Sequence, residues 1–210
     1  MAYLKNLFEF TGKLGNVVGY YYKGKHCVRR LPVRKNEIVS PAQMAHRKRF
    51  AVASKFVQCI SPLLKHSISE HKRMSKQNIV MSHTMKNAIT GNYPNFDINY
   101  SKVFISRGML LNAWSEKART ESGNVLFTWK DNSIHHGCNG KADDKAILVV
   151  YCEALNLCIY SLNSINRSAG SATLPVLPFL GHKVETWIGF ISANGKLISD
   201  STYTGALYIT

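Results

Sequence analysis

Short runs of β-branched and aromatic residues mark the first part of the chain. Asn16–Tyr22 forms one run, Lys23-Gly24 supplies turn residues, and Lys25–Leu31 forms a second run. Two such runs around a short glycine-containing turn predict a β-hairpin. Pro32 ends the second strand, because proline cannot donate to a strand ladder. Gly12–Gly15 is a G-x-x-G without the rest of a phosphate-binding loop, so we interpret it as a tight turn.

A helical period follows the hairpin. Ser40 is a good N-cap, and Pro41 suits the first helical position. Ser61-Pro62 then predicts a break or kink. A second helix is predicted over Ser75–Thr90, with Gly91 as its stop. Apolar residues recur at steps of three and four and predict one buried stripe: Phe50, Ala53, Val57, Ile60 and Leu64.

Beyond Pro94 the pattern is typical of strands, with an expected loop over Arg107–Gly123. Short, evenly spaced runs separated by turn residues indicate a sandwich or barrel. No helical segment intervenes, which argues against a parallel α/β sheet. The fold class is therefore α+β: a basic hairpin-and-helix region over residues 1–106, and an antiparallel β-sandwich over 107–210. The predicted strands are Tyr100–Ser106, Asn124–Trp129, Lys145–Cys152, Leu157–Leu162, Ser171–Leu174, Val184–Ser192 and Tyr203–Ile209.

Charge divides the chain unevenly. Residues 1–106 hold 18 Lys/Arg and 4 Asp/Glu, so 18 − 4 = +14, whereas residues 107–210 hold 9 and 8, so 9 − 8 = +1. Such asymmetry favours a polyanionic partner for the first half: nucleic acid, an anionic membrane surface or an acidic protein face. The alternative is a basic surface that serves solubility alone.

Aromatic and basic residues alternate along the predicted hairpin. Tyr20 and Tyr22 share one face of a strand and Tyr21 takes the other. Tyrosines on a β surface can stack bases while Lys and Arg neutralise phosphates; alternatively, Tyr20 and Tyr22 pack on the first helix as core residues. Arg47-Lys48-Arg49 spans neighbouring helix positions, so at least one of the three turns toward the apolar stripe. The predicted polyanion- or partner-binding set is Lys13, Tyr20, Tyr22, Lys23, Lys25, Arg29, Arg30, Arg34, Lys35, Arg47 and Lys48.

Candidate catalytic or metal chemistry is sparse. His135, His136 and Cys138 offer three metal-ligand types in four residues, but adjacent histidines in a Gly/Asn loop are more often solvated than metal-bound. There is no G-x-S-x-G elbow and no H-E-x-x-H. We therefore expect a non-catalytic protein without a cofactor, a metal or a small-molecule substrate.

The cysteines and the first residues bear on location. Five cysteines, an odd number without C-x-x-C spacing, argue against a disulfide framework. Met1–Phe10 has no signal-peptide pattern, and no stretch reaches the ~18 apolar residues of a membrane span. We expect reduced thiols, cytoplasmic synthesis and no membrane span.

Two resemblances follow from motifs. Val125–Trp129 resembles the B strand of a fibronectin type III or immunoglobulin-like domain, with Trp129 as its buried tryptophan. Val184–Tyr203 resembles its F strand, turn and G strand. Almost the whole chain also resembles an uncharacterised family of Bacteroidota proteins without an assigned function. The residues that match are Gly12–Gly19, Lys23–Lys25, Val28-Arg29, Pro41–Gln43, Arg47–Phe50, Ile105–Gly108, Trp129, Asp144-Lys145, Arg167–Gly170 and Ser199–Tyr203.

These patterns lead to two functional hypotheses. The first is a structural or assembly subunit, of a virion-like or surface assembly, that uses the sandwich as a docking module and binds copies of itself or other protein subunits. Its support includes a similarity of the short Gln-Arg-Phe helix to phage-like structural proteins. The alternative is a nucleic-acid-binding protein that uses the basic half without sequence preference.

Overall fold

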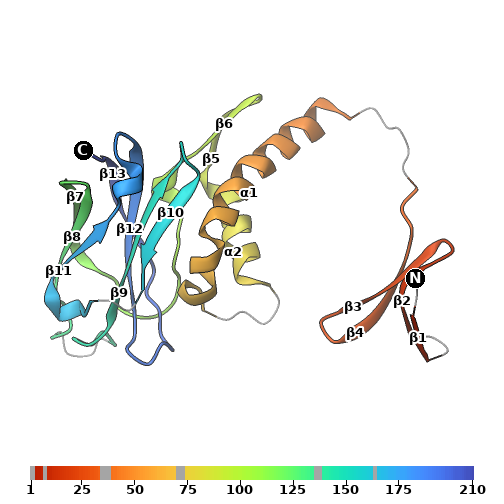
Figure 1. The fold of residues 1–210 in the computed structure, drawn as a ribbon, viewed down its shortest axis with the longest axis horizontal. Helices are drawn as coiled ribbons and strands as arrows, with labels where there is room; N and C mark the ends of the chain where they lie inside the picture. The colour runs from red at the N-terminus through yellow and green to blue at the C-terminus, as the bar shows by residue number, and fades with distance from the viewer. Residues whose placement is uncertain (1–2, 7–8, 34–38, 70–73, 135–138, 163–164) are drawn as a thin grey trace. The chain divides into compact units, whose positions relative to one another are not determined.

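The chain folds as two units, Met1–Ser40 and Pro41–Thr210 (Figure 1). The computed structural model describes residues 3–6, 9–33, 39–69, 74–134, 139–162 and 165–210. The expected boundary lay between residues 106 and 107, and the structure divides the chain elsewhere. The helices share a hydrophobic core with the sandwich, so both belong to the second unit.

The first unit is an antiparallel sheet in the order β1-β2-β3-β4. Its strands are β1 (Tyr3–Asn6), β2 (Glu9–Leu14), β3 (Val17–Tyr22) and β4 (Lys25–Arg30). The predicted hairpin is confirmed, since β3 and β4 pair from Val17↔Arg30 to Tyr22↔Lys25. Most of the G-x-x-G lies within β2, and the turn falls at its last glycine, Gly15, whose φ of 56° suits that residue.

Helices open the second unit. α1 (Pro41–Ser67) begins directly after Ser40, as expected, and buries Ala53, Val57, Ile60 and Leu64 of the predicted stripe. Phe50 is 49% exposed, because it precedes the part of the helix that packs. Of the break or kink expected at Ser61-Pro62, a break does not occur: α1 continues through Pro62, where Ile60, Leu63 and Leu64 are fully buried.

The segment after α1 departs from the predicted pattern. α2 (Lys76–His83) starts at its Ser75 cap and continues as the π-helical turn η1 (Thr84–Ala88). The expected helix to Thr90 is therefore too long, because β5 (Ile89–Asn92) pairs with β6 (Asn95–Ile98). The strand expected over Tyr100–Ser106 is also wrong: a 3₁₀ turn, η2 (Tyr100–Lys102), leads into irregular chain.

The sandwich consists of two antiparallel sheets, as predicted. One has the order β11-β8-β7 and the other the order β10-β9-β12-β13. Six strands match predicted runs, and β7 lies in the segment expected to be a loop. The strands are β7 (Trp114–Glu121), β8 (Asn124–Lys130), β9 (Lys145–Cys152), β10 (Leu157–Ser161), β11 (Ser171–Pro175), β12 (Lys183–Ile191) and β13 (Thr202–Tyr208); the 3₁₀ turns η3 (Arg167–Ala169) and η4 (Leu177–Phe179) flank β11.

The second unit has three layers: helices, the four-stranded sheet and the three-stranded sheet (Figure 1). Strand β9 lies in the middle, and its side chains alternate between two cores. Ile147, Val149 and Tyr151 face the helices, whereas Leu148 and Val150 face the other sheet. This explains why β9 is apolar from Ala146 to Cys152.

Helix α1 is part of the same hydrophobic core as the sandwich. Its Phe56 is 1% exposed and packs edge-on against Tyr151, with ring centroids 5.0 Å apart. The same ring lies 6.4 Å from Trp187 of β12 and 5.7 Å from Tyr100. A core shared in this way places the helices and the sandwich in one unit.

Candidate functional site

The N-terminal sheet carries tyrosines and cations on one face. Directly paired residues share a face, and the pairs Lys13↔Val18, Val18↔Arg29 and Tyr22↔Lys25 alternate with pairs on the other side. We call Lys13, Tyr20, Tyr22, Lys25 and Arg29 the basic tyrosine face. The Arg29 guanidinium lies 5.8 Å from the Tyr20 ring centroid, within cation–π range.

Within the first unit, described side chains on both faces of β3 and β4 are exposed. Tyr20 is 39% exposed and Tyr22 58%, so neither belongs to a core formed by the sheet itself. On the opposite face Tyr21 is 57% exposed and Val28 55%. Between residues 10 and 33 no hydrophobic side chain is buried, and this stretch holds five Lys/Arg and no Asp/Glu.

The other residues of the predicted polyanion- or partner-binding set do not all lie on the basic tyrosine face. Lys23 lies in the turn beside the face, with its Nζ 5.6 Å from the Tyr22 ring centroid, whereas Arg30 pairs with Val17 on the opposite face. Arg34 and Lys35 lie outside the described residues. Arg47 and Lys48 are exposed on α1, in the other unit.

Arg49 confirms the expectation that one cation of this helix turns toward the apolar stripe. Its Nη2 donates to the Met85 carbonyl oxygen at 3.1 Å, and its guanidinium lies 5.8 Å from the Phe96 ring centroid. The side chain therefore joins α1 to η1 and β6 and does not belong to a polyanion surface.

A fully buried arginine joins the segments of the sandwich. Arg167 donates from Nε to Asp144 at 3.3 Å, from Nη1 to the Asn132 side chain at 2.7 Å, and from Nη2 to the Leu111 carbonyl at 2.8 Å. Its guanidinium stacks 3.8 Å from the Phe190 ring centroid. Burial lowers the pKa of Arg167, and the Asp144 carboxylate opposes this. The arrangement is structural, because every described partner is a fixed protein group.

The motif Ile105–Gly108 also makes structural contacts. The backbone N–H groups of Ile105 and Ser106 donate to the Ser201 hydroxyl at 2.9 and 3.3 Å, and Gly108 N–H donates to Asp200 at 3.0 Å. Two of the matching motifs are thus brought together across the fold. They fix the irregular chain before β7 against the segment before β13.

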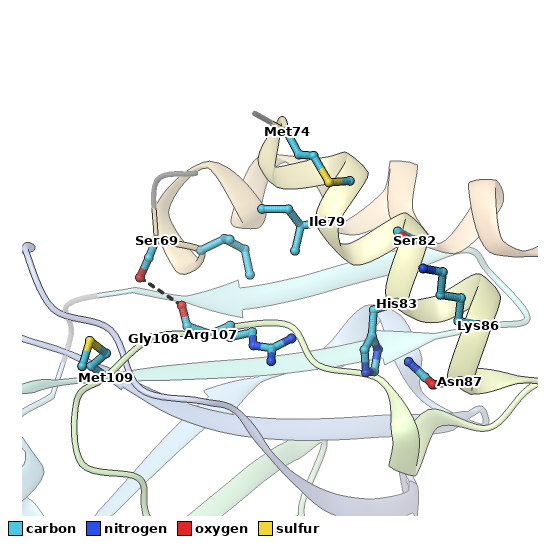
Figure 2. A pocket seen from close by; sticks show the side chains of 11 residues that line it. Ser69, Met74, Ile79, Ser82, His83, Lys86, Asn87, Arg107, Gly108 and Met109 are labelled. Atoms are coloured by element: carbon cyan, nitrogen blue, oxygen red, sulfur yellow. Dashed lines mark hydrogen bonds between the residues drawn. The ribbon is translucent and has the colours of Figure 1, made fainter. Parts of the chain in front are cut away.

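A pocket of about 670 Å³ opens between α2, η1 and the chain around Arg107 (Figure 2). In Figure 2 the Arg107 side chain extends toward His83, with Asn87 beside the His83 ring, while Ile79 and Met74 lie across the pocket. Burial lowers the pKa of His83, and Arg107 adds to this effect. The sequence patterns did not identify this pocket. Its lining residues are Ile68, Ser69, Met74, Ile79, Ser82, His83, Lys86, Asn87, Arg107, Gly108 and Met109.

The described parts of the chain offer few side chains for metal binding or thiol chemistry. No group of three or more His, Cys, Asp or Glu side chains there is placed to hold a metal ion, and His135, His136 and Cys138 lie outside them. Cys27, Cys59, Cys152 and Cys158 are free thiols. Burial raises the pKa of Cys59 and Cys158, which disfavours their thiolates. Among the helices described, none is both long and apolar enough to cross a membrane.

Fold and surface together define a helix-covered β-sandwich protein with a basic sheet joined to it. The chain belongs to the Family of unknown function (DUF6266), whose model matches residues 9–205. It is also similar to the solution structure of the fn3 domain of human collagen alpha-1(XX) chain: 16% of residues are identical, 48% of this chain and 88% of that chain are covered, and the TM-score is 0.35. No curated protein matches the sequence. The Bacteroidota origin stays a prediction.

Proposed function

We propose that the protein is a non-catalytic assembly subunit, in which the body Pro41–Thr210 carries a basic N-terminal sheet that docks on an acidic protein surface. One observation supports this most strongly: residues 10–33 form a sheet without a hydrophobic core. Small sheets need a packed face for stability in water. A partner that covers Tyr20, Tyr22 or Val28 would supply that face.

Charge suggests where the partner surface lies. Residues 10–33 contain cations and no carboxylates, so two copies of this sheet repel each other. The body as a whole is also basic, with 19 Lys/Arg and 10 Asp/Glu over residues 41–210, but its sandwich part, residues 107–210, holds 9 and 8. That part exposes carboxylates at Glu121, Asp143, Glu153 and Asp200, which are the complementary groups. Contact between the sheet of one copy and the body of the next is a head-to-tail arrangement, which builds rings or filaments.

Truncation tests this proposal. Light scattering at matched concentration and low salt should show that the mass of the full chain rises with concentration, while residues 41–210 stay monomeric. The charge-reversed variant Lys25→Glu/Arg29→Glu should lose assembly, because it removes the sheet's attraction for carboxylates. Monomeric behaviour of the full chain at every concentration would contradict assembly through copies of itself.

Nucleic-acid binding is the second candidate, and the basic tyrosine face supports it. Tyr20 and Tyr22 stand on the same side as Lys13, Lys25 and Arg29. Exposed aromatic rings beside cations bind single strands without sequence preference, since any base can stack and any phosphate can be neutralised. Nucleic-acid binding requires phosphate groups on the partner, whereas the assembly proposal requires carboxylates on the partner.

Fluorescence anisotropy with a labelled oligothymidylate separates the two faces of the sheet. If nucleic acid is the partner, Tyr20→Ala/Tyr22→Ala should weaken binding ~10-fold or more, because each stacked base contributes about 1–3 kcal/mol. Four cations on or beside the face predict a slope of log K against log salt of about −3. Tyr21→Ala and Arg30→Glu are the matched controls on the opposite face. Equal losses for both faces would exclude a specific surface.

A further inference from the structure

The pocket of Figure 2 has an exposed cation, Arg107, on one wall. Arg107 N–H donates to the Ser67 carbonyl at 3.1 Å, and its own carbonyl accepts from Ser69 N–H at 3.3 Å and from the Ser69 hydroxyl at 3.1 Å. Gly108 lets the chain pass close to its neighbour, because a Cβ there would lie 2.2 Å from the Ile198 carbonyl oxygen. The backbone that carries the guanidinium is therefore firmly anchored.

The Arg107 guanidinium contacts an aromatic ring of the described chain. It lies 5.2 Å from the Phe104 ring centroid, and the His83 ring lies 4.6 Å from the same centroid. Neither an ion pair nor a side-chain hydrogen bond joins Arg107 to the residues that the structure describes. His83 Nδ1 is likewise buried without a hydrogen-bond partner among them. The buried His83 Nδ1 favours a ligand that satisfies it, and the exposed Arg107 guanidinium supplies a cation beside it.

The wall formed by α2 and η1 is only partly apolar, since Ser82, Lys86 and Asn87 line it together with Ile79. Ile68 is 2% exposed and closes the pocket, Ile79 lies above it, and Met74 and Met109 stand at its rim with 41% and 86% exposure. Methionine side chains adapt to ligands of different shape. No described lining residue is an Asp or Glu. The volume of about 670 Å³ suits a small organic molecule.

We propose that this pocket binds a single carboxylate carried on an apolar group. The planar guanidinium of Arg107 pairs with both oxygens of the carboxylate, a geometry that a carboxylate matches well. The lowered pKa of His83 leaves its ring neutral at pH 7, so the ring adds a hydrogen bond and no charge. The apolar group lies against Ile68 and Ile79. This site is independent of the N-terminal sheet.

Calorimetric titration of the full chain with octanoate tests the site, with octanamide as the uncharged control. We expect saturable binding of octanoate alone and a loss of affinity of at least ~10-fold in Arg107→Gln, since hydrogen bonds to charged groups contribute about 1.5–3 kcal/mol. Arg119→Gln, on exposed β7, removes the same charge outside the pocket and should bind as the parent does. Near-ultraviolet circular dichroism confirms that both variants fold.

The pKa of the His83 ring provides a second measurement of ligand binding. This pKa, measured by NMR, should rise when octanoate binds, because a nearby anion stabilises the imidazolium. An acetylated Leu-Leu dipeptide, with its C-terminal amide as the uncharged control, distinguishes a polypeptide C-terminus from a free fatty acid. If the dipeptide acid binds more tightly than octanoate, the carboxylate comes from a polypeptide C-terminus; if octanoate binds more tightly, it comes from a free acid. The proposal is overturned if octanamide binds as tightly as octanoate, or if Arg107→Gln and Arg119→Gln lose affinity equally. It is also overturned if octyl phosphate binds more tightly than octanoate, or if octanoate does not bind.

Discussion

Replacing Arg167 with methionine should destabilise the body by about 3–5 kcal/mol, because it leaves a buried carboxylate without its cation. Asp144 is 1% exposed and retains only the Lys141 N–H as a described hydrogen-bond donor. The Asn132 side chain and the Leu111 carbonyl lose donors in the same step. Urea unfolding of residues 41–210 should show a lower midpoint at an unchanged slope.

Two variants control this experiment. Arg119→Met removes an exposed cation and should change stability by no more than about 0.5 kcal/mol. Arg167→Lys should not restore stability, because one ammonium group cannot match the planar set of donors directed at Asp144, Asn132 and Leu111. A loss below about 1 kcal/mol in Arg167→Met would show that the network contributes little.

The sandwich without its helices, residues 107–210, should fail to unfold cooperatively, whereas residues 41–210 should show one sharp transition. Without α1 the face of the sheet that carries Ile147, Val149 and Trp187 becomes exposed. An apolar surface of this kind drives aggregation or a loosely packed state that binds hydrophobic dyes.

A point substitution gives the milder form of the same effect. Phe56→Ala in residues 41–210 should cost about 3–5 kcal/mol, because the ring is buried against Tyr100, Tyr151 and Trp187. Phe50→Ala, on the exposed part of the same helix, is the matched control. A cooperative transition of residues 107–210 as stable as that of 41–210 would restore the boundary expected between residues 106 and 107.

The strands of the sandwich were predictable where a run of apolar residues ends in turn residues, as in Asn124–Trp129 and Lys145–Cys152. β7 was missed because it is mostly polar, and only alternate residues are half-buried. Tyr100–Ser106 looks like a strand, since Tyr100, Val103 and Ile105 are apolar, but it packs as irregular chain on the core. Burial there follows tertiary contacts and not the period of a strand.

The boundary and the pocket show what a linear pattern leaves out. Net charge describes surfaces and not cores. The boundary expected from charge therefore divided the helices from the sandwich, although the two share one core. The unbroken apolar run of β9 signalled that both faces of its sheet are covered. The basic tyrosine face was predictable because alternation on a strand is local. His83 and Arg107 were not, since tertiary contacts bring them together, among them the bridge between Ile68 and Arg107 and the packing of both on Phe104.

Hydrogen exchange of the β3 and β4 amides tests most directly whether the N-terminal sheet depends on a partner. In the full chain at ~1 μM these amides should exchange at nearly unprotected rates, while those of β9 and β12 stay protected, because local stability follows buried contacts. At ~100-fold higher concentration and low salt, β3 and β4 should become protected and β9 should not change. Strong protection of β3 and β4 at the lowest concentration, equal to that of β9, would show that the sheet is stable by itself and would contradict its role as a docking module.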